Sequence, residues 1–127
     1  MLDHITFGVA DFDRALRFYD EALAPLGIKR LMSVTPEETG GAGFAGYGDT
    51  RPFFWVGTGA PTTGALHVAF TSPDRATVDA FYRAALAAGG KDNGAPGVRE
   101  HYHPTYYGAF VLDPEGRNIE AVCHAPA

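Results

Sequence analysis

The fold is decided by a pattern that occurs twice: LDHITFGVADFDRALRFYDEALAPLG at residues 2–27 and ALHVAFTSPDRATVDAFYRAALAAGG at residues 65–90. An offset of 63 residues separates His4 from His67 and Gly27 from Gly90. A period of this length is too long for a solenoid repeat and is typical of a duplicated supersecondary module. A duplicated fold accounts for the repeated core residues, whereas a histidine repeated within a strand indicates a function.

Each copy begins with a strand and continues into an amphipathic helix. Apolar and polar residues alternate at the start of each copy, as in a half-buried strand, and the following apolar residues lie on one helical face. Ser72 and Pro73 predict an N-cap and a first helical residue in the second copy. The predicted elements are helices at about 11–24 and 73–88; strands at 2–9, 28–34, 44–47, 52–56, 65–71, 98–101, 106–112 and 117–122; loops at 36–43 and 91–97; a linker at 57–64; and a turn at 113–116.

These elements define two tandem βαβββ modules, at about 1–58 and 65–127, within one domain that spans residues 1–127. We expect an α+β fold in which the modules form an open, cup-shaped mixed β-sheet with the helices outside. Each helix covers one face of its sheet. The other face must meet the second module, or a module of another chain, and this concave face would take a ligand.

Composition restricts the classes of partner. The chain has 127 residues, 46% hydrophobic and 20% charged, which is typical of one soluble globular domain. A formal net charge of −5 argues against nucleic acid and anionic membranes as partners. Neither a membrane-spanning run nor a signal peptide is expected, and the single cysteine, Cys123, is consistent with a reducing cytoplasm. The expected partner is a small molecule.

Three side chains able to bind a metal are predicted on the cleft face. Because side chains alternate along a strand, placing the apolar neighbours under the helices leaves His4, His67 and Glu120 in the cleft. Two histidines and one carboxylate form a known arrangement for divalent metals. A glutamate between Ile119 and Ala121 would be costly to bury without a partner charge. The structural alternative is that the histidines are hydrogen-bonded core residues and the glutamate is solvated.

Several segments carry a family resemblance that covers essentially the whole chain. They are Asp3-His4-Ile5, the pairs Phe18-Tyr19 and Phe81-Tyr82, Leu66–Phe70, and Asp113–Glu120 preceded by Tyr106–Val111. On these residues the sequence resembles the vicinal oxygen chelate superfamily: glyoxalase I, bleomycin-resistance proteins, extradiol dioxygenases and fosfomycin-resistance enzymes. The resemblance implies paired modules around one divalent metal, with its ligands at His4, His67 and Glu120. The metal could be iron, manganese, zinc or nickel.

One position departs from glyoxalase I. Matching 49–54 with 113 onward places Phe54 at the counterpart of Glu120, where the resemblance implies a carboxylate that binds metal and moves a proton. Phe54 can do neither, so the remaining triad looks more like that of extradiol dioxygenases and fosfomycin-resistance transferases. We expect Phe54 and Val56 to keep part of the substrate pocket apolar.

The tyrosines and histidines of 101–107 are the remaining candidates. His101 and His103 could act as general acid or base because histidine titrates near physiological pH. Tyr106 could hydrogen-bond an oxyanion, and Tyr102 and Tyr107 could stack on a substrate ring. We therefore predict His101, His103 and Tyr106 as catalytic, with both other tyrosines in the substrate pocket. The alternative is that 100–104 is a surface loop.

Two functions follow from this site. The first is a metal-dependent small-molecule enzyme of glyoxalase or dioxygenase type, a lyase or oxidoreductase, in which the ion chelates an anionic substrate through vicinal oxygens. The alternative is a non-catalytic small-molecule binding protein of the bleomycin-resistance type. Cup-shaped modules leave apolar edges to cover, so both functions predict a homodimer. Pairing of the modules within a chain or between chains is left open.

Overall fold

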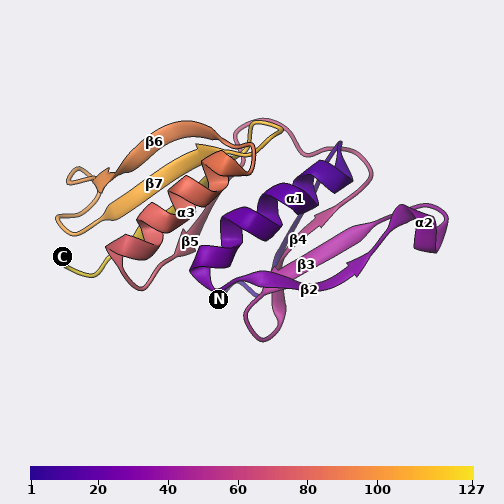
Figure 1. Ribbon diagram of the computed structural model, residues 1–127, viewed down its shortest axis with the longest axis horizontal. Coiled ribbons are helices and arrows are strands. Elements are labelled where there is room, and N and C mark those ends of the chain that lie inside the picture. Colours follow the sequence, from indigo (N-terminus) through magenta and orange to yellow (C-terminus); the bar gives the residue numbers. More distant parts are fainter.

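The computed structural model describes residues 1–127 as two four-stranded sheets, each with a helix on one face (Figure 1). The first sheet has the order β1-β4-β3-β2 and the second β5-β8-β7-β6. In each, the first strand pairs in parallel with the last, and the other pairs are antiparallel. The elements are β1 (Ile5–Gly8), α1 (Phe12–Leu23), a 3-10 turn (Ala24–Leu26), β2 (Lys29–Val34), α2 (Pro36–Thr39), β3 (Phe44–Gly48), β4 (Pro52–Gly57), β5 (His67–Thr71), α3 (Arg75–Ala87), β6 (Lys91–Val98), β7 (Tyr107–Leu112) and β8 (Asn118–Cys123).

The predicted α+β class and its two βαβββ modules are confirmed. Equivalent aspartates start both long helices: the Asp11 side chain accepts from Arg14 N at 3.0 Å, and that of Asp74 from Thr77 N at 2.7 Å. The predicted cap at Ser72 is therefore wrong. A carboxylate caps as well as a hydroxyl and also interacts favourably with the positive end of the helix dipole.

Two segments differ from the sequence prediction. The strand expected at 98–101 lies earlier, at β6, in a segment expected to be a loop because of Gly94, Pro96 and Gly97. As an edge strand, β6 tolerates a proline, and its register against β7 shifts twice near these glycines, as β-bulges allow. The expected loop at 36–43 contains the single-turn helix α2, whose N-terminus is stabilised by a capping box.

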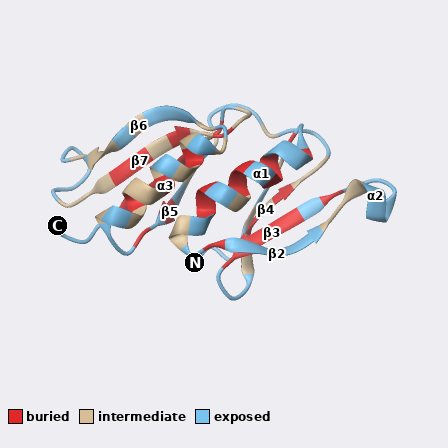
Figure 2. Cartoon of the chain, viewed as in Figure 1, coloured by how far each residue is buried: buried red, intermediate tan, exposed pale blue.

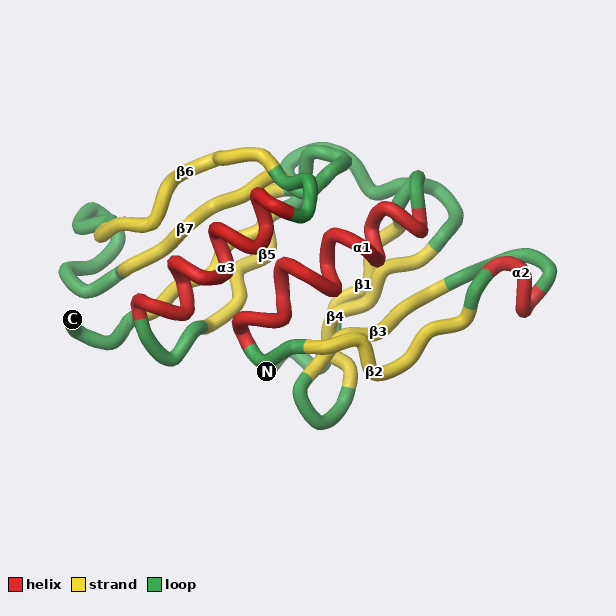
Figure 3. Tube along the Cα trace, in the orientation of Figure 1, coloured by secondary structure: helices red, strands yellow, loops and turns green.

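The two long helices lie side by side in one layer, with the sheets behind them (Figures 1 and 3). Buried residues concentrate where helices and sheets meet (Figure 2), and residues of both modules form one core cluster. The two sheets share no ladder. Because both helices occupy the same side, the uncovered sheet faces lie on the opposite side of the molecule. No helix is both long and apolar enough to span a membrane.

A buried polar network joins the modules. Arg117, 3% exposed, donates from Nη1 to Asp113 Oδ2 at 3.1 Å and from Nη2 to the carbonyl oxygen of Gly8 at 2.8 Å. Asp113 also accepts from the Tyr19 hydroxyl at 2.5 Å. Glu115 accepts from the backbone N–H groups that precede α1. The turn at 113–116 is thereby fixed to the end of β1 and the start of α1.

Candidate metal centre

A buried carboxylate stands on the uncovered face of the second sheet. In β8, Ile119 and Ala121 enter the core, and Glu120 between them points to the opposite face. Glu120 is nevertheless only 1% exposed. Its Oε1 lies 2.8 Å from Nε2 of His67 on the adjacent strand β5, and its Oε2 accepts a hydrogen bond from the Tyr106 hydroxyl. No lysine or arginine pairs with it, so its negative charge has no permanent cation beside it.

Tyr106 is held in its protonated form. Burial and, after it, the hydrogen bond to Glu120 raise the pKa of the Tyr106 hydroxyl well above its usual range. At neutral pH the phenol is therefore a hydrogen-bond donor, and it fixes the orientation of the Glu120 carboxylate.

The donor pair on this face suits a divalent ion. Two adjacent ligands at about 2.1 Å from an ion are about 3 Å apart in an octahedral site and about 3.4 Å apart in a tetrahedral one. The 2.8 Å between His67 Nε2 and Glu120 Oε1 is a hydrogen-bond distance, and it is close to the octahedral separation. An imidazole nitrogen and a carboxylate oxygen are also ligand types shared by zinc, manganese and iron sites.

His4 does not join this pair within one copy. It precedes β1 and is exposed, and its Nδ1 lies 2.7 Å from Asp3 Oδ1. Asp3 in turn accepts from Arg51 at 3.0 Å. No three histidine, cysteine, aspartate or glutamate side chains gather as a metal site within the chain. The structure thus brings together His67 and Glu120 of the predicted triad, but not His4.

The other predicted polar residues lie at increasing distance from Glu120. Tyr106 contacts the carboxylate directly, and the ring of Tyr102 stands edge-on to that of Tyr106 at 5.0 Å. The His101 ring lies next to that of Tyr102 on the exposed turn between β6 and β7, with the ring centres 4.1 Å apart and the planes tilted by 48°. His103, on the same turn, accepts at Nδ1 from Thr105 N at 3.1 Å. Neither histidine is hydrogen-bonded to Glu120.

Three predicted pocket residues face the helices instead. Phe54 and Val56 are fully buried in the core, and the Phe54 ring packs against those of Phe7, Tyr19, Tyr47 and Phe70. The Tyr107 hydroxyl donates to Asp79 on α3 at 2.6 Å. Strand alternation puts these three residues on the helix side of their sheets, away from the face that carries Glu120.

Trp55, rather than Phe54, is the counterpart of Glu120. Thr6 of β1 pairs with Trp55 of β4, and its repeat equivalent Ala69 of β5 pairs with Glu120 of β8. Trp55 covers Gly46, where an added Cβ would lie 2.8 Å from the indole. The equivalent position thus carries an aromatic ring in one module and a carboxylate in the other. Sequence reasoning missed this residue, although the alternation of Phe54 and Val56 with Trp55 in β4 was a usable signal.

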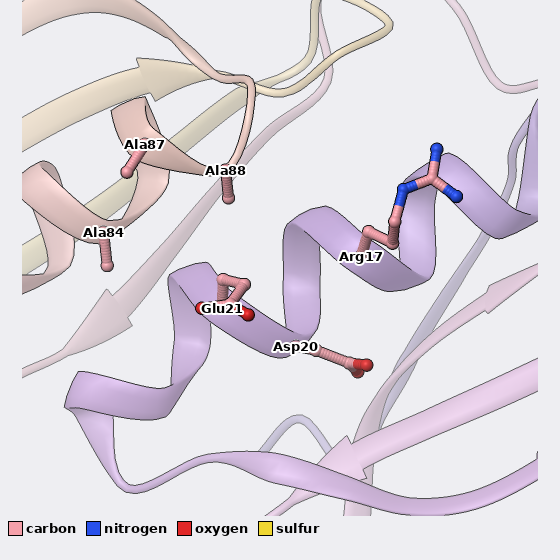
Figure 4. A pocket seen from close by; sticks show the side chains of 6 residues that line it. All are labelled: Arg17, Asp20, Glu21, Ala84, Ala87 and Ala88. Atoms are coloured by element: carbon pink, nitrogen blue, oxygen red, sulfur yellow. The ribbon is translucent and has the colours of Figure 1, made fainter.

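The molecule has two hollows, and the smaller one is lined by Ala69, the residue that pairs with Glu120 in the sheet. One of about 420 Å³ lies between α1 and α3 (Figure 4) and is lined by Arg17, Asp20, Glu21, Ala84, Ala87 and Ala88. A smaller apolar hollow of about 160 Å³ lies between β4 and β5, with Phe53, Phe54 and Val68 among its lining residues. Neither hollow is lined by His67 or Glu120, so the open sheet face is not an enclosed pocket within one copy.

Comparison with known proteins identifies the family. The family model described as the Glyoxalase/Bleomycin resistance protein/Dioxygenase superfamily matches residues 1–121, and the chain belongs to this superfamily. The resemblance found in the sequence is thereby confirmed. No protein with curated annotation matches the sequence.

Solved structures share the fold. A glyoxalase/bleomycin resistance protein from Albidiferax ferrireducens T118 is 28% identical, with a TM-score of 0.75 over 95% of this chain and 97% of that one. Glyoxalase I from Zea mays is 24% identical, with a TM-score of 0.69; the match covers 99% of this chain but 45% of the maize chain. FosX, a fosfomycin resistance protein from Listeria monocytogenes determined with Mn(II) and sulfate, is 15% identical, with a TM-score of 0.69 over 97% of this chain and 91% of FosX.

Proposed function

We propose that the protein is a metal-dependent enzyme acting on a small molecule, with a divalent ion held by His67 and Glu120 of one copy and His4 of a second copy. The observation that carries the proposal is the Glu120 carboxylate, 1% exposed, whose one ion-pair partner is His67, itself a side chain of a metal-ligand type. Buried carboxylates pair with cations or coordinate metals, and a divalent ion would bind both of these groups. The Mn(II) in FosX, which shares the fold, supports a metal here.

A second copy is proposed because the modules of one chain cannot enclose the site together. Their helices pack side by side, so both uncovered sheet faces lie on the same side of the chain (Figure 1). A dimer that opposes these faces would set the first module of one copy against the second module of the other. His4 occupies the repeat position of His67, which is the placement expected for the missing imidazole ligand.

The ion and three side chains of the second module have proposed roles in the reaction. When bound, the ion would supply Lewis acidity and a point at which two neighbouring substrate oxygens chelate. The Tyr106 hydroxyl donates its single proton to Glu120 and thereby orients this carboxylate towards the ion and the substrate. His101 and His103, on the turn outside Tyr106, are the proposed groups for moving protons at the rim of the site.

Metal content tests the proposal. We expect one divalent ion per chain in protein purified without chelator, measured by elemental analysis. His67→Ala and Glu120→Gln should lose the ion, whereas His101→Ala, a histidine on the exposed turn, should retain it. Protein that takes up none of manganese, iron, nickel or zinc would refute the proposal, as would a His67→Ala variant that keeps its metal.

Complementation tests the contribution of the second copy. His4→Ala and His67→Ala chains would each lack metal alone. If the site is shared between copies, co-expression gives heterodimers with one intact site, so about a quarter of the sites should bind metal again for random pairing of symmetric copies. A site built within one chain would regain none.

The second candidate function is a small-molecule binding protein without chemistry. Trp55 and its neighbour Phe44 favour it, because they make the uncovered face of the first sheet apolar where the second sheet carries a carboxylate. Such a protein would bind its ligand equally well before and after treatment with a chelator.

A further inference from the structure

A second charged group lies on the same sheet face as Glu120. The Phe110 side chain points to this face, because Phe110 pairs directly with Glu120 in the sheet. The imidazole of His67 stands 5.9 Å from the Phe110 ring centre, and the guanidinium carbon of Arg99 stands 5.4 Å from it. The imidazole of His67 and the guanidinium of Arg99 therefore both adjoin the Phe110 ring, and they are at most about 11 Å apart. A single small molecule can span this distance.

Arg99 is held in a fixed place by the backbone of β6. Its Nη1 donates to the carbonyl oxygen of Gly97 at 2.9 Å, and its Nη2 donates to that of Ala95 at 2.8 Å. Two glycines make room for it: a Cβ added at Gly94 or Gly97 would lie 3.1 Å from a guanidinium nitrogen. These glycines also explain why the sequence of β6 looked like a loop.

The charge of Arg99 is not neutralised within the chain. Arg99, like Arg17, Arg75 and Arg83, forms no ion pair, whereas the arginines at positions 14, 30, 51 and 117 do. The hydrogen-bond partners of Arg99 are two neutral carbonyl oxygens. A guanidinium has five N–H donors, so those not used by the two carbonyls can bind another group. A pre-positioned arginine suits a planar oxyanion such as a carboxylate or phosphate.

We propose that Arg99 binds a negatively charged group of the substrate, separate from the oxygens that chelate the ion. The inference rests on the proposed function in placing the chelating end at His67 and Glu120. The substrate class is then a small molecule with two neighbouring oxygens at one end and a carboxylate or phosphate at the other. Phe110 lies beneath the part that joins them.

Two chelating probes test the proposal on Mn(II)-loaded protein: catechol, and 3,4-dihydroxybenzoate, which adds a carboxylate. Arg99→Gln should weaken calorimetric binding of 3,4-dihydroxybenzoate about tenfold to a hundredfold, the usual effect of a charge-assisted pair, and leave catechol binding unchanged. Arg99→Lys should restore part of the loss. Arg83→Gln removes an exposed arginine of α3 and should affect neither probe.

A metal-free arm separates this inference from the proposed function. Inorganic phosphate, titrated into metal-free protein, should shift the Arg99 Nε–H signal in NMR spectra saturably, and leave that of Arg83 in place. A phosphate response in a protein that binds no metal would refute the proposed function but support the anion site. An unmoved Arg99 signal, or equal weakening of both probes by Arg99→Gln in a variant that unfolds at the wild-type temperature, would overturn the anion site.

Discussion

Replacing Arg117 by methionine should destabilise the protein severely. The guanidinium is 3% exposed and bonded to Asp113, Glu115 and the carbonyls of Gly8 and Thr62. Methionine removes the cation and leaves the Asp113 carboxylate, also 3% exposed, without its partner charge. Breaking a buried ion pair in this way costs about 3–5 kcal/mol, out of a total free energy of unfolding of roughly 5–15 kcal/mol.

Urea unfolding at neutral pH and fixed protein concentration measures this loss. Thermal unfolding should show the same loss. At about 4 °C per kcal/mol for a chain of this size, the melting temperature should fall by roughly 12–20 °C. Arg14→Met is the matched control, because Arg14 faces Asp11 at 3.9 Å on the surface with both side chains about half exposed. Surface pairs contribute at most about 1 kcal/mol.

A double variant tests whether the orphaned charge is the cause. Asp113→Asn keeps the hydrogen-bond acceptor for the backbone N–H groups of the turn but removes the charge. The double variant Asp113→Asn/Arg117→Met should therefore lose less stability than the two single variants added together, by about 1–3 kcal/mol. Simple additivity, or a loss below about 1 kcal/mol for Arg117→Met alone, would refute the reasoning.

Two further outcomes are expected from the same kind of measurement. Burial raises the pKa of Glu115, but hydrogen bonds from the Ala10 and Asp11 N–H groups, together with the hydrogen bond and the charge of Arg117, outweigh it, so the pKa lies below its usual value of 4.5. The ionised carboxylate therefore stabilises the fold above the unfolded pKa, and this stabilisation is lost as the pH falls through the lowered pKa of the folded state. Glu115→Gln should be less stable than wild type by up to about 1 kcal/mol at neutral pH, and the difference should shrink as the pH falls below 4.5. Phe54→Ala should cost about 3–5 kcal/mol because a fully buried ring is lost; a cost below about 1 kcal/mol in urea titrations would place Phe54 on the solvent side of its strand.

The fold could be predicted from sequence because the evidence for it is local and occurs twice. Alternation fixed the faces of β5 and β8 correctly: Phe70 and Ala121 are in the core and Glu120 is not. Edge strand β6 was missed because its bulges need glycines, which in sequence resemble a loop. Its place is set by pairing with β7, a contact that local sequence does not encode.

The site was predicted only in part, because the difference between the two turns was applied wrongly. Glu120 follows Asp113 by seven residues and Trp55 follows Asp49 by six, so a turn that is one residue shorter in the first module places Trp55, not Phe54, at the equivalent position, in agreement with the strand pairing. The separation of His4 from His67 depends on how whole modules pack, and residue spacing within a strand carries no information about that.

The contrast between Trp55 and Glu120 has a consequence for how any ligand would lie. Between two identical halves, a guest molecule could be turned end over end without change in energy and would occupy both poses equally. In a dimer that opposes the two sheet faces, one face would present the indole of Trp55 and the other the carboxylate of Glu120. Turning the ligand round would place its polar end against the indole and its apolar end against the carboxylate. The difference between the two modules at this position would therefore favour a single orientation of the bound ligand.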